Sequence, residues 1–193
     1  MDTTVISKPA NRPKSGPVST GSLVVTDVTS AAVRLPAFDG HERVVIAKDP
    51  ASGLHAIVAI HDRSLGPALG GCRMWPYASE TDALVDVLRL SRGMTYKNAM
   101  AGLAAGGGKA VIIGDSRTQK SEALFRAFGR FLNHFHGDYV TGEDVGISAS
   151  DMDAAAAESI YVLGTNARGG DPSPITAYMT VPLRPDPACY NFA

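Results

Sequence analysis

Apolar and polar residues follow each other along the chain with two periods, one typical of strands and one typical of helices. Two short apolar runs, at 44–47 and 54–60, flank the turn-forming sequence DPASG at 49–53 and predict a β-hairpin. A third strand is expected over 69–74, and the buried-strand pattern KAVIIG predicts a fourth over 109–114.

Apolar residues at helical spacing predict two amphipathic helices. The first begins near Ser79, because the sequence SETD at 79–82 matches a capping box. The second is expected over 121–135. The apolar positions are Leu84, Val87 and Leu88 in the first helix and Leu124, Phe128, Leu132 and Phe135 in the second.

Shorter elements are expected after the second helix. A strand is predicted at about 138–141, a short Ala-rich helix is predicted behind the cap SDMD at 150–153, and residues 161–163 add a last strand. Strands and helices therefore alternate after Leu69. This order predicts an α/β fold with a mixed β-sheet flanked by helices.

Length and composition predict one folded domain with tails. The chain has 193 residues, of which 45% are hydrophobic and 19% charged, as in ordinary globular proteins. Residues 1–40 are rich in Ser, Thr and Pro near their start and show no sustained period, so we expect a flexible segment. The folded domain is then expected over 41–178, with an irregular tail over 179–193.

Charge and cysteine usage exclude several classes of function. A net charge of -1 gives no field that would attract nucleic acid or an anionic membrane. No run approaches the roughly 18 apolar residues of a membrane span, so we expect a cytoplasmic protein. Cys72 and Cys189 have no Cys or His neighbours at zinc-ligand spacing, and we expect neither a disulfide nor a metal site.

The glycine run at 106–108, followed by Lys109, is the most unusual local feature. A Walker-type phosphate loop would need glycine at 103 and Ser or Thr at 110, where the chain has Leu103 and Ala110. The chain also lacks the G-x-G-x-x-G pattern of dinucleotide sites. A plain flexible turn and a close backbone approach to a ligand both stay open.

Two lysines and two carboxylates are the candidate chemical groups. Lys97 and Lys109 lie in apolar, Gly-rich surroundings, where mutual repulsion and loss of solvent would make one of them a usable base or hydrogen-bond donor. A solvated surface group is the alternative for Lys97. Glu143 and Asp144 follow a strand, as active-site carboxylates of α/β domains often do, although a carboxylate that caps the next segment is the alternative.

Four segments together resemble a known family. The segments 61–77, 88–115, 121–131 and 139–146 resemble the N-terminal catalytic domain of the Glu/Leu/Phe/Val amino-acid dehydrogenases. The branched-chain members, leucine dehydrogenases above all, are the most similar. The resemblance runs from about Glu42 to Tyr178 and implies the α/β fold of that domain.

The resemblance implies a role for each matching residue. Lys97 matches the lysine that binds the substrate α-carboxylate, helped by the backbone of Gly70 and Gly71. Lys109 matches the lysine that acts at the amino and carbonyl centre, and Asp144 matches the carboxylate that transfers protons. The side-chain pocket would be lined by Leu69, Met94 and Gly142, and Thr176 would lie near the nicotinamide.

The reaction that the resemblance implies is the oxidative deamination of a branched-chain L-amino acid. Hydride leaves the substrate Cα for NAD, water adds to the iminium with help from Lys109 and Asp144, and the carbinolamine collapses to ammonia and a 2-oxo acid. A homo-oligomer is implied as well. A positive cluster that holds a carboxylate, beside a carboxylate that moves protons, suits this chemistry.

The chain departs from the family pattern after Tyr178. Family members continue there into a linking helix and a Rossmann domain that binds NAD. Residues 179–193, MTVPLRPDPACYNFA, contain three prolines and predict neither helix nor strand. We therefore expect that the Rossmann domain is absent, through a truncation or frame change, and that the chain alone is inactive. The alternative is a non-catalytic amino-acid-binding or assembly module that keeps the family fold.

Overall fold

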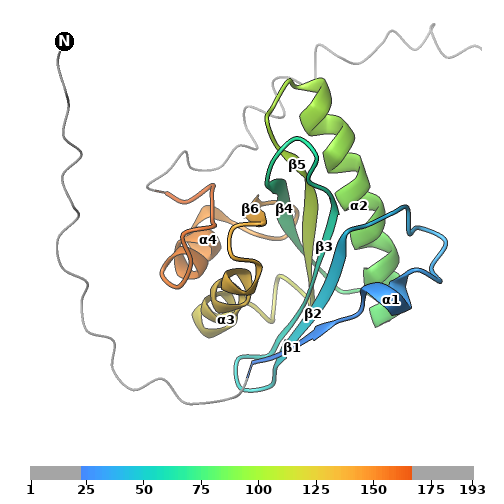
Figure 1. The fold of residues 1–193 in the computed structure, drawn as a ribbon. Coiled ribbons are helices and arrows are strands. Elements are labelled where there is room, and N and C mark those ends of the chain that lie inside the picture. The colour runs from blue at the N-terminus through green and yellow to red at the C-terminus, as the bar shows by residue number, and fades with distance from the viewer. Residues whose placement is uncertain (1–22, 167–193) are drawn as a thin grey trace, which may run out of the picture.

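The computed structural model describes residues 23–166. These residues form a six-stranded sheet in the order β1-β2-β3-β5-β4-β6, with α1 and α2 on one face and α3 and α4 on the other (Figure 1). The elements are β1 (Val24–Asp27), α1 (Thr29–Ala32), β2 (Arg43–Asp49), β3 (Leu54–Asp62), β4 (Ala68–Trp75), α2 (Glu80–Met100), β5 (Gly106–Ile113), α3 (Glu122–Leu132), the 3-10 helix η1 (Asn133–Phe135), β6 (Tyr139–Glu143) and α4 (Ala149–Ala156).

The sheet is mixed, which confirms the predicted fold class. β1, β2, β3 and β5 pair with each other antiparallel, whereas β4 pairs parallel with both β5 and β6. Parallel neighbours need a long crossover, and α2 supplies it between β4 and β5. The pairing places Cys72 opposite Ala110 and Gly71 opposite Gly142, so segments far apart in sequence meet on β4.

Each face of the sheet has its own hydrophobic core. The core under α3 and α4 is aromatic, and its largest fully buried side chains include Phe125, Phe128, Phe131, Phe135 and Tyr139. The core under α2 is smaller and aliphatic, and it includes Val44, Ile57, Val87, Leu88 and Val111. Successive residues of a strand point to opposite faces, so β2, β3 and β5 each contribute to both cores.

The predicted hairpin, the strands at 69–74 and 109–114 and both long helices are confirmed. Ser79 caps α2, because its Oγ accepts a hydrogen bond from the Asp82 amide at 3.1 Å. Ser121 caps α3 in the same way through the Leu124 amide, also at 3.1 Å. Each serine therefore gives a partner to one amide of the first helical turn that would otherwise be unpaired.

Two predicted details near the C-terminal end need correction. The N-cap of α4 is Ser148 and not Ser150, because the Asp151 carboxylate accepts the Ser148 amide hydrogen bond at 2.8 Å and closes the capping box. Residues 161–163 form one parallel bridge, Thr141 with Val162, rather than a full strand. The Leu163 amide donates to the Thr141 carbonyl at 2.7 Å and fixes this bridge.

The expected flexible segment contains structure from residue 23 onward. β1 pairs antiparallel with β2, with Val25 opposite Ala47, and α1 follows it. The four residues of β1 are too few to show a visible period in the sequence. Pairing with β2 stabilises this strand, and no local pattern predicts such pairing. Residues 1–22 and 167–193 lie outside the described range, so the expected boundary at 178 and the irregular tail stay predictions.

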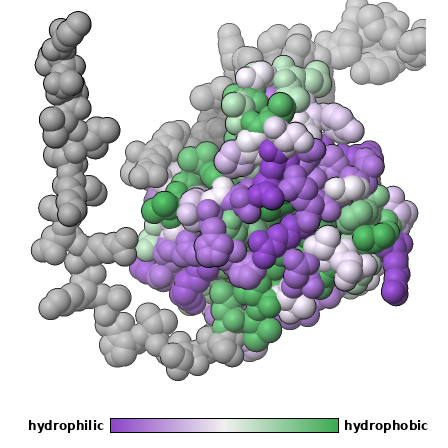
Figure 2. Space-filling model, viewed as in Figure 1, coloured by the Kyte–Doolittle hydropathy of each residue, from purple (hydrophilic) through white to green (hydrophobic). Residues whose placement is uncertain are grey.

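Within residues 23–166, no helix is long and apolar enough to cross a membrane. Figure 2 shows a mostly hydrophilic middle of this face and hydrophobic residues at the end of the molecule where α2 ends. Tyr96, Met100 and Leu103 are the exposed hydrophobic residues there.

Candidate active site

A cleft of about 830 Å³ lies where β4, β5 and β6 meet the C-terminal half of α2. Eight of the nine site residues predicted from the sequence line it: Leu69, Gly70, Gly71, Met94, Lys97, Lys109, Gly142 and Asp144. The ninth, Thr176, lies outside the described residues. The fold therefore brings together residues that are up to 75 positions apart in the chain, from Leu69 to Asp144.

An ion pair between a buried lysine and a half-buried carboxylate lines this cleft. Lys109 Nζ lies 2.6 Å from Asp144 Oδ2, and the Lys109 side chain is only 7% exposed. Burial would raise the pKa of the Asp144 carboxyl, but the hydrogen bond and charge of Lys109, with the charge of Arg73, outweigh it and hold the pKa below the ordinary 3.8. Asp144 is therefore an anion at neutral pH and is able to accept a proton.

Lys97 occupies a different environment in the same cleft. It is exposed on the last turn of α2, whereas Lys109 is buried in β5. A flexible, solvated ammonium at the cleft surface suits the capture of an anionic ligand. The two lysines thus offer one cation at the surface and one in the interior.

The glycine run is part of a strand, so the plain turn, one of the two alternatives for it, is wrong. Gly107 and Gly108 lie inside β5 and are buried. A Cβ on Gly107 would collide with Thr95 of α2, and a Cβ on Gly108 would lie 2.7 Å from the Tyr139 ring. The glycines are needed because a helix and an aromatic ring press directly on the backbone of β5.

Two buried side chains fix the backbone around the predicted carboxylate-binding glycines. Tyr139 donates from Oη to the Gly70 carbonyl at 2.8 Å. Asn98 donates from Nδ2 to the Leu69 carbonyl at 3.1 Å and to the Gly106 carbonyl at 2.7 Å. Helix α2 and strands β4, β5 and β6 are therefore locked together beside the cleft.

The wall of the cleft is apolar next to Gly142. Leu69 and Met94 are partly exposed in it, and Leu163 is 44% exposed. A Cβ on Gly142 would have only the Leu163 carbonyl near it, at 3.9 Å, so there is open space at this position. Such a wall suits an aliphatic group better than a charged one.

Sequence reasoning missed several residues of the site. Arg73 on β4 is the most notable, because its Nε lies 3.4 Å from the same Asp144 oxygen that Lys109 contacts. A charged residue inside an otherwise small and apolar strand was the only signal for it. The cleft is also lined by Val145, Gly146, Ile147 and Leu163, which the sequence did not single out, and by Glu143, which it did.

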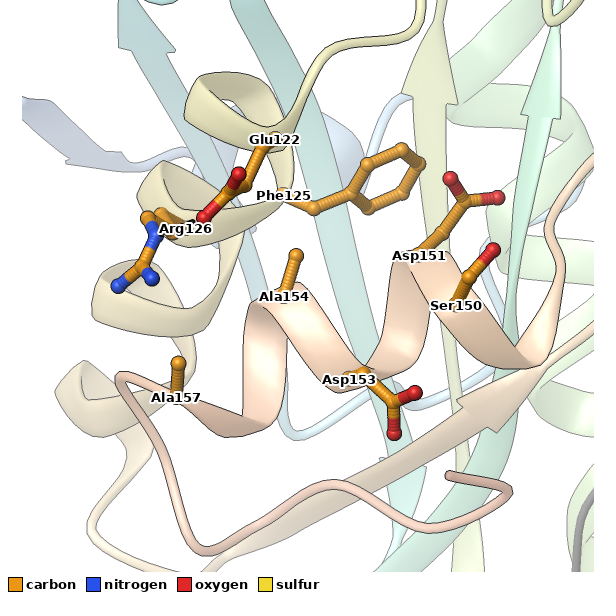
Figure 3. Close-up of a pocket in the computed structure, with 8 residues that line it drawn as sticks. All are labelled: Glu122, Phe125, Arg126, Ser150, Asp151, Asp153, Ala154 and Ala157. Atoms are coloured by element: carbon orange, nitrogen blue, oxygen red, sulfur yellow. Dashed lines mark hydrogen bonds and ion pairs between the residues drawn. The ribbon is translucent and has the colours of Figure 1, made fainter. Parts of the chain in front are cut away.

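A second hollow, of about 400 Å³, lies between α3 and α4. Figure 3 shows Glu122 and Arg126 side by side on α3, with Asp151 and Asp153 on α4. Arg126 pairs with Glu122 at 2.8 Å, Asp151 pairs with Lys120 at 2.5 Å, and Asp153 accepts hydrogen bonds from Asn166, so these polar groups already have partners within the chain. No group of three or more possible metal ligands occurs within residues 23–166.

The chain is similar in sequence to one family of amino-acid dehydrogenases. The family model described as Glu/Leu/Phe/Val dehydrogenase, dimerisation domain, matches residues 41–166. The chain is 59% identical over 141 residues to leucine dehydrogenase from Geobacillus stearothermophilus, which covers 72% of this chain and 38% of that protein. It is 57% identical over 142 residues to valine dehydrogenase from Streptomyces virginiae, covering 72% of this chain and 40% of that protein.

Solved structures agree. The crystal structure of L-tryptophan dehydrogenase from Nostoc punctiforme matches with a TM-score of 0.62 and 48% identity, over 64% of this chain and 37% of that chain. The hetero-hexameric glutamate dehydrogenase from Thermus thermophilus matches with a TM-score of 0.52 at 24% identity, over 78% of this chain and 35% of that chain, which shows a shared fold. The chain spans about 40% of the length of the relatives that it matches.

Proposed function

The chain belongs to the Glu/Leu/Phe/Val dehydrogenase family, and from this premise we propose that it is the substrate-binding and catalytic half of a branched-chain L-amino-acid dehydrogenase. The reaction would be the oxidative deamination of leucine- or valine-type substrates to 2-oxo acids and ammonia. The observation that carries the proposal is the ion pair of buried Lys109 with Asp144, at 2.6 Å, in a cleft that exposed Lys97 also lines.

The two lysines would have different roles, one in substrate binding and one at the reacting carbon. Lys97 would hold the substrate α-carboxylate, with the backbone of Gly70 and Gly71 beside it. Lys109 would stabilise the negative charge that develops on oxygen when water adds at the reacting carbon. Asp144 would take a proton from that water and return it to the leaving amine, as a general base and then a general acid.

The pocket would favour aliphatic side chains. Leu69 and Met94 give an apolar wall, and Gly142 leaves open space that fits a leucine side chain or a larger group. A glutamate side chain would lose its hydration against this wall without gaining a cation there. We therefore propose the preference Leu, Val or Ile, with Phe as the nearest competitor and Glu last.

NAD stays the expected hydride acceptor, but we assign it to no residue of 23–166. The described residues contain neither a G-x-G-x-x-G turn nor a Rossmann unit that would hold its pyrophosphate. Thr176, expected near the nicotinamide, lies outside the described range. We propose that turnover requires a nucleotide-binding domain in addition to this one.

Self-association is the further part of the proposal. The matching family model is named a dimerisation domain, and most soluble oligomers are symmetric homo-oligomers. We propose that the chain forms a homo-oligomer through this domain. Sedimentation of the purified chain tests it, and a strictly monomeric species at all concentrations would count against it.

The test joins this chain after Tyr178 to a nucleotide-binding domain and measures leucine-dependent NADH formation. We expect Lys109→Ala to lower kcat by about 10²–10⁴-fold, and Lys97→Ala mainly to raise KM. Lys48→Ala, which removes a half-exposed lysine of β2, is the matched control and should change neither.

Two results would contradict the proposal. Equal effects of Lys97→Ala and Lys109→Ala on both parameters would show that the roles are wrongly assigned. A joined protein that binds 4-methyl-2-oxopentanoate but never forms NADH would favour the alternative, a non-catalytic amino-acid-binding module.

A further inference from the structure

Arg73 lies at the centre of an ionic chain that leads from helix α2 into the cleft. Its Nη1 donates to Asp86 Oδ2 of α2 at 3.1 Å, and its Nε lies 3.4 Å from Asp144 Oδ2. Tyr77 Oη donates to the same Asp86 oxygen at 2.6 Å. One guanidinium from β4 therefore joins a carboxylate of α2 to the carboxylate that follows β6.

The direction of the Arg73 side chain follows from strand alternation. Its neighbour Cys72 is fully buried in the core under α3 and α4, so Arg73 projects to the face on which α2 lies. The Arg73 side chain is 25% exposed and keeps contact with solvent through a hollow of about 440 Å³ that Trp75 also lines.

Two cations contact one oxygen of Asp144. Lys109 Nζ lies 2.6 Å from Oδ2 on one side, and Arg73 Nε lies 3.4 Å from it on another. Contacts from two separate strands restrict the rotation of the carboxylate more than either contact alone. Asp86 in turn holds the guanidinium, whose planar fork allows it to engage two carboxylates at once.

We propose that Arg73 is a positioning residue, which holds the Asp144 carboxylate against Lys109 and is itself held by Asp86 and Tyr77. This inference rests on the proposed function of the cleft. In that reaction Asp144 must return to the same place and the anionic state after each proton transfer. Arg73 provides both conditions without contacting the substrate.

Other titratable groups line the same cleft or lie in the strands beside it. The groups that face Asp144 from the cleft or the strands beneath are Lys97, Cys72, Tyr139 and Glu143. Cys72 and Tyr139 are fully buried, and burial raises the pKa of the Cys72 thiol and of the Tyr139 hydroxyl, so both stay neutral. Lys109 and Arg73 are the two cations in ion-pair contact with Asp144 among the described residues.

The experiment uses the full chain and follows Asp144 directly by NMR. The variants are Arg73→Gln, Arg73→Lys and the control Arg126→Gln, which removes an arginine of α3 that pairs with Glu122 and Glu158. The first measurement is the pH titration of the Asp144 side-chain ¹³C signal. The second is the Lys109 ammonium ¹⁵N signal, which is visible only while ion pairing slows its exchange with water.

We expect Arg73→Gln to raise the titration midpoint of Asp144 by about one pH unit, because a carboxylate loses one of its two cations. The same variant should broaden the Lys109 signal, since the carboxylate is no longer fixed. Arg73→Lys should keep the low midpoint by charge but broaden the Lys109 signal, because an ammonium cannot bridge Asp86 and Asp144. Arg126→Gln should change neither.

Unchanged midpoint and unchanged Lys109 signal in folded Arg73→Gln would overturn the inference. If Arg73→Gln fails to fold, Arg73→Lys decides, and a Lys109 signal as sharp as in the unaltered chain would overturn it. Binding of 4-methyl-2-oxopentanoate to the unaltered chain is measured in parallel. Its absence would count against the proposed function, whereas the Asp144 titration tests Arg73 independently of binding.

Discussion

The two faces of the sheet use the same strands for opposite purposes. Toward α3 and α4, β4 and β5 present Cys72 and Ala110 to a fully buried aromatic core. Toward α2, the adjacent residues of the same strands are Arg73, after Cys72, and Lys109, before Ala110, and both contact Asp144. A one-residue step along a strand therefore separates a position that stabilises the fold from a position that carries charge into the cleft.

Residues that stabilise the fold and residues that line the cleft are therefore separated across the thickness of the sheet rather than along the chain. The face under α3 and α4 buries apolar area, whereas the face under α2 carries charged side chains and glycines beside the cleft. Substitutions under α3 and α4 should therefore mainly lower stability, whereas substitutions near the cleft should mainly change ligand binding. The substitution with the largest expected effect on stability tests this separation most directly.

Removal of an aromatic ring from the core under α3 should have the largest effect on stability. Phe128 is fully buried there, so Phe128→Ala should lower the free energy of unfolding by about 3–5 kcal/mol through lost burial and the cavity left behind. Urea unfolding measures this loss. Oxo-acid affinity per folded molecule should be unchanged, and a parallel loss of affinity would show that the two faces of the sheet are not independent.

Tyr139 is the side chain that acts on both faces, and it gives the next largest effect. Its ring packs in the aromatic core while its Oη donates to the Gly70 carbonyl. Tyr139→Phe keeps the ring and leaves a buried carbonyl without that donor, at a cost of about 1–3 kcal/mol. We expect lower stability and weaker ligand binding together. Loss of stability with full binding would show that the hydroxyl does not serve the cleft.

The two serine caps compare helices on opposite faces with the same chemistry. Ser79→Ala and Ser121→Ala each remove one hydrogen bond of 3.1 Å to a backbone amide. Each should lower the free energy of unfolding by about 1 kcal/mol, as measured by thermal unfolding. A clearly smaller loss for Ser79→Ala would mean that the start of α2 contributes less to the free energy of unfolding than the start of α3.

The pH dependence of stability should come more from the α2 face, with the smallest effect of the four. Burial lowers the pKa of His41 below 6.5, outweighing the hydrogen bond to the Leu88 carbonyl that would raise it. The unfolded chain then binds the proton more readily, so this stability is complete above pH 6.5 and declines as the pH falls below it. His134, whose pKa is also lowered, is exposed on the other face and should contribute less.

Urea unfolding between pH 7.5 and about 5.5 measures the slope that this linkage produces. His41→Gln should flatten the slope, whereas His134→Gln should leave most of it. Equal slopes in both variants would show that burial of His41 does not control the dependence.

Local patterns in the sequence predicted most of the fold, whereas most of the predicted cleft-lining residues came from the family resemblance. The stripe of Phe128 and its neighbours in α3 has a clear period, and the cap at Ser79 has a clear motif. The resemblance to a family supplied Lys97, Lys109 and Asp144, which residue chemistry alone had left with alternatives.

The features that sequence reasoning missed are contacts between elements. The glycine run at 106–108 resembles a turn in isolation, and only the approach of Thr95 and Tyr139 explains why it is a strand. Arg73 shows no pattern of its own, because its role depends on Asp86 and Asp144 meeting it across the sheet. Hydrophobic periodicity does not predict contacts between elements that are far apart in the sequence.

The strand order also ranks how easily the two partners of the buried ion pair are separated. Lys109 lies in β5, which is flanked by β3 and β4, whereas Asp144 follows β6 at the edge of the sheet. Edge strands open locally at a lower free energy than central strands, so native-state hydrogen exchange should release the β6 amides before those of β5. The bridge from Thr141 to Val162 covers that edge. We therefore expect the Thr141–Val162 bridge, in the segment after α4, to lower how often β6 opens and Asp144 separates from Lys109.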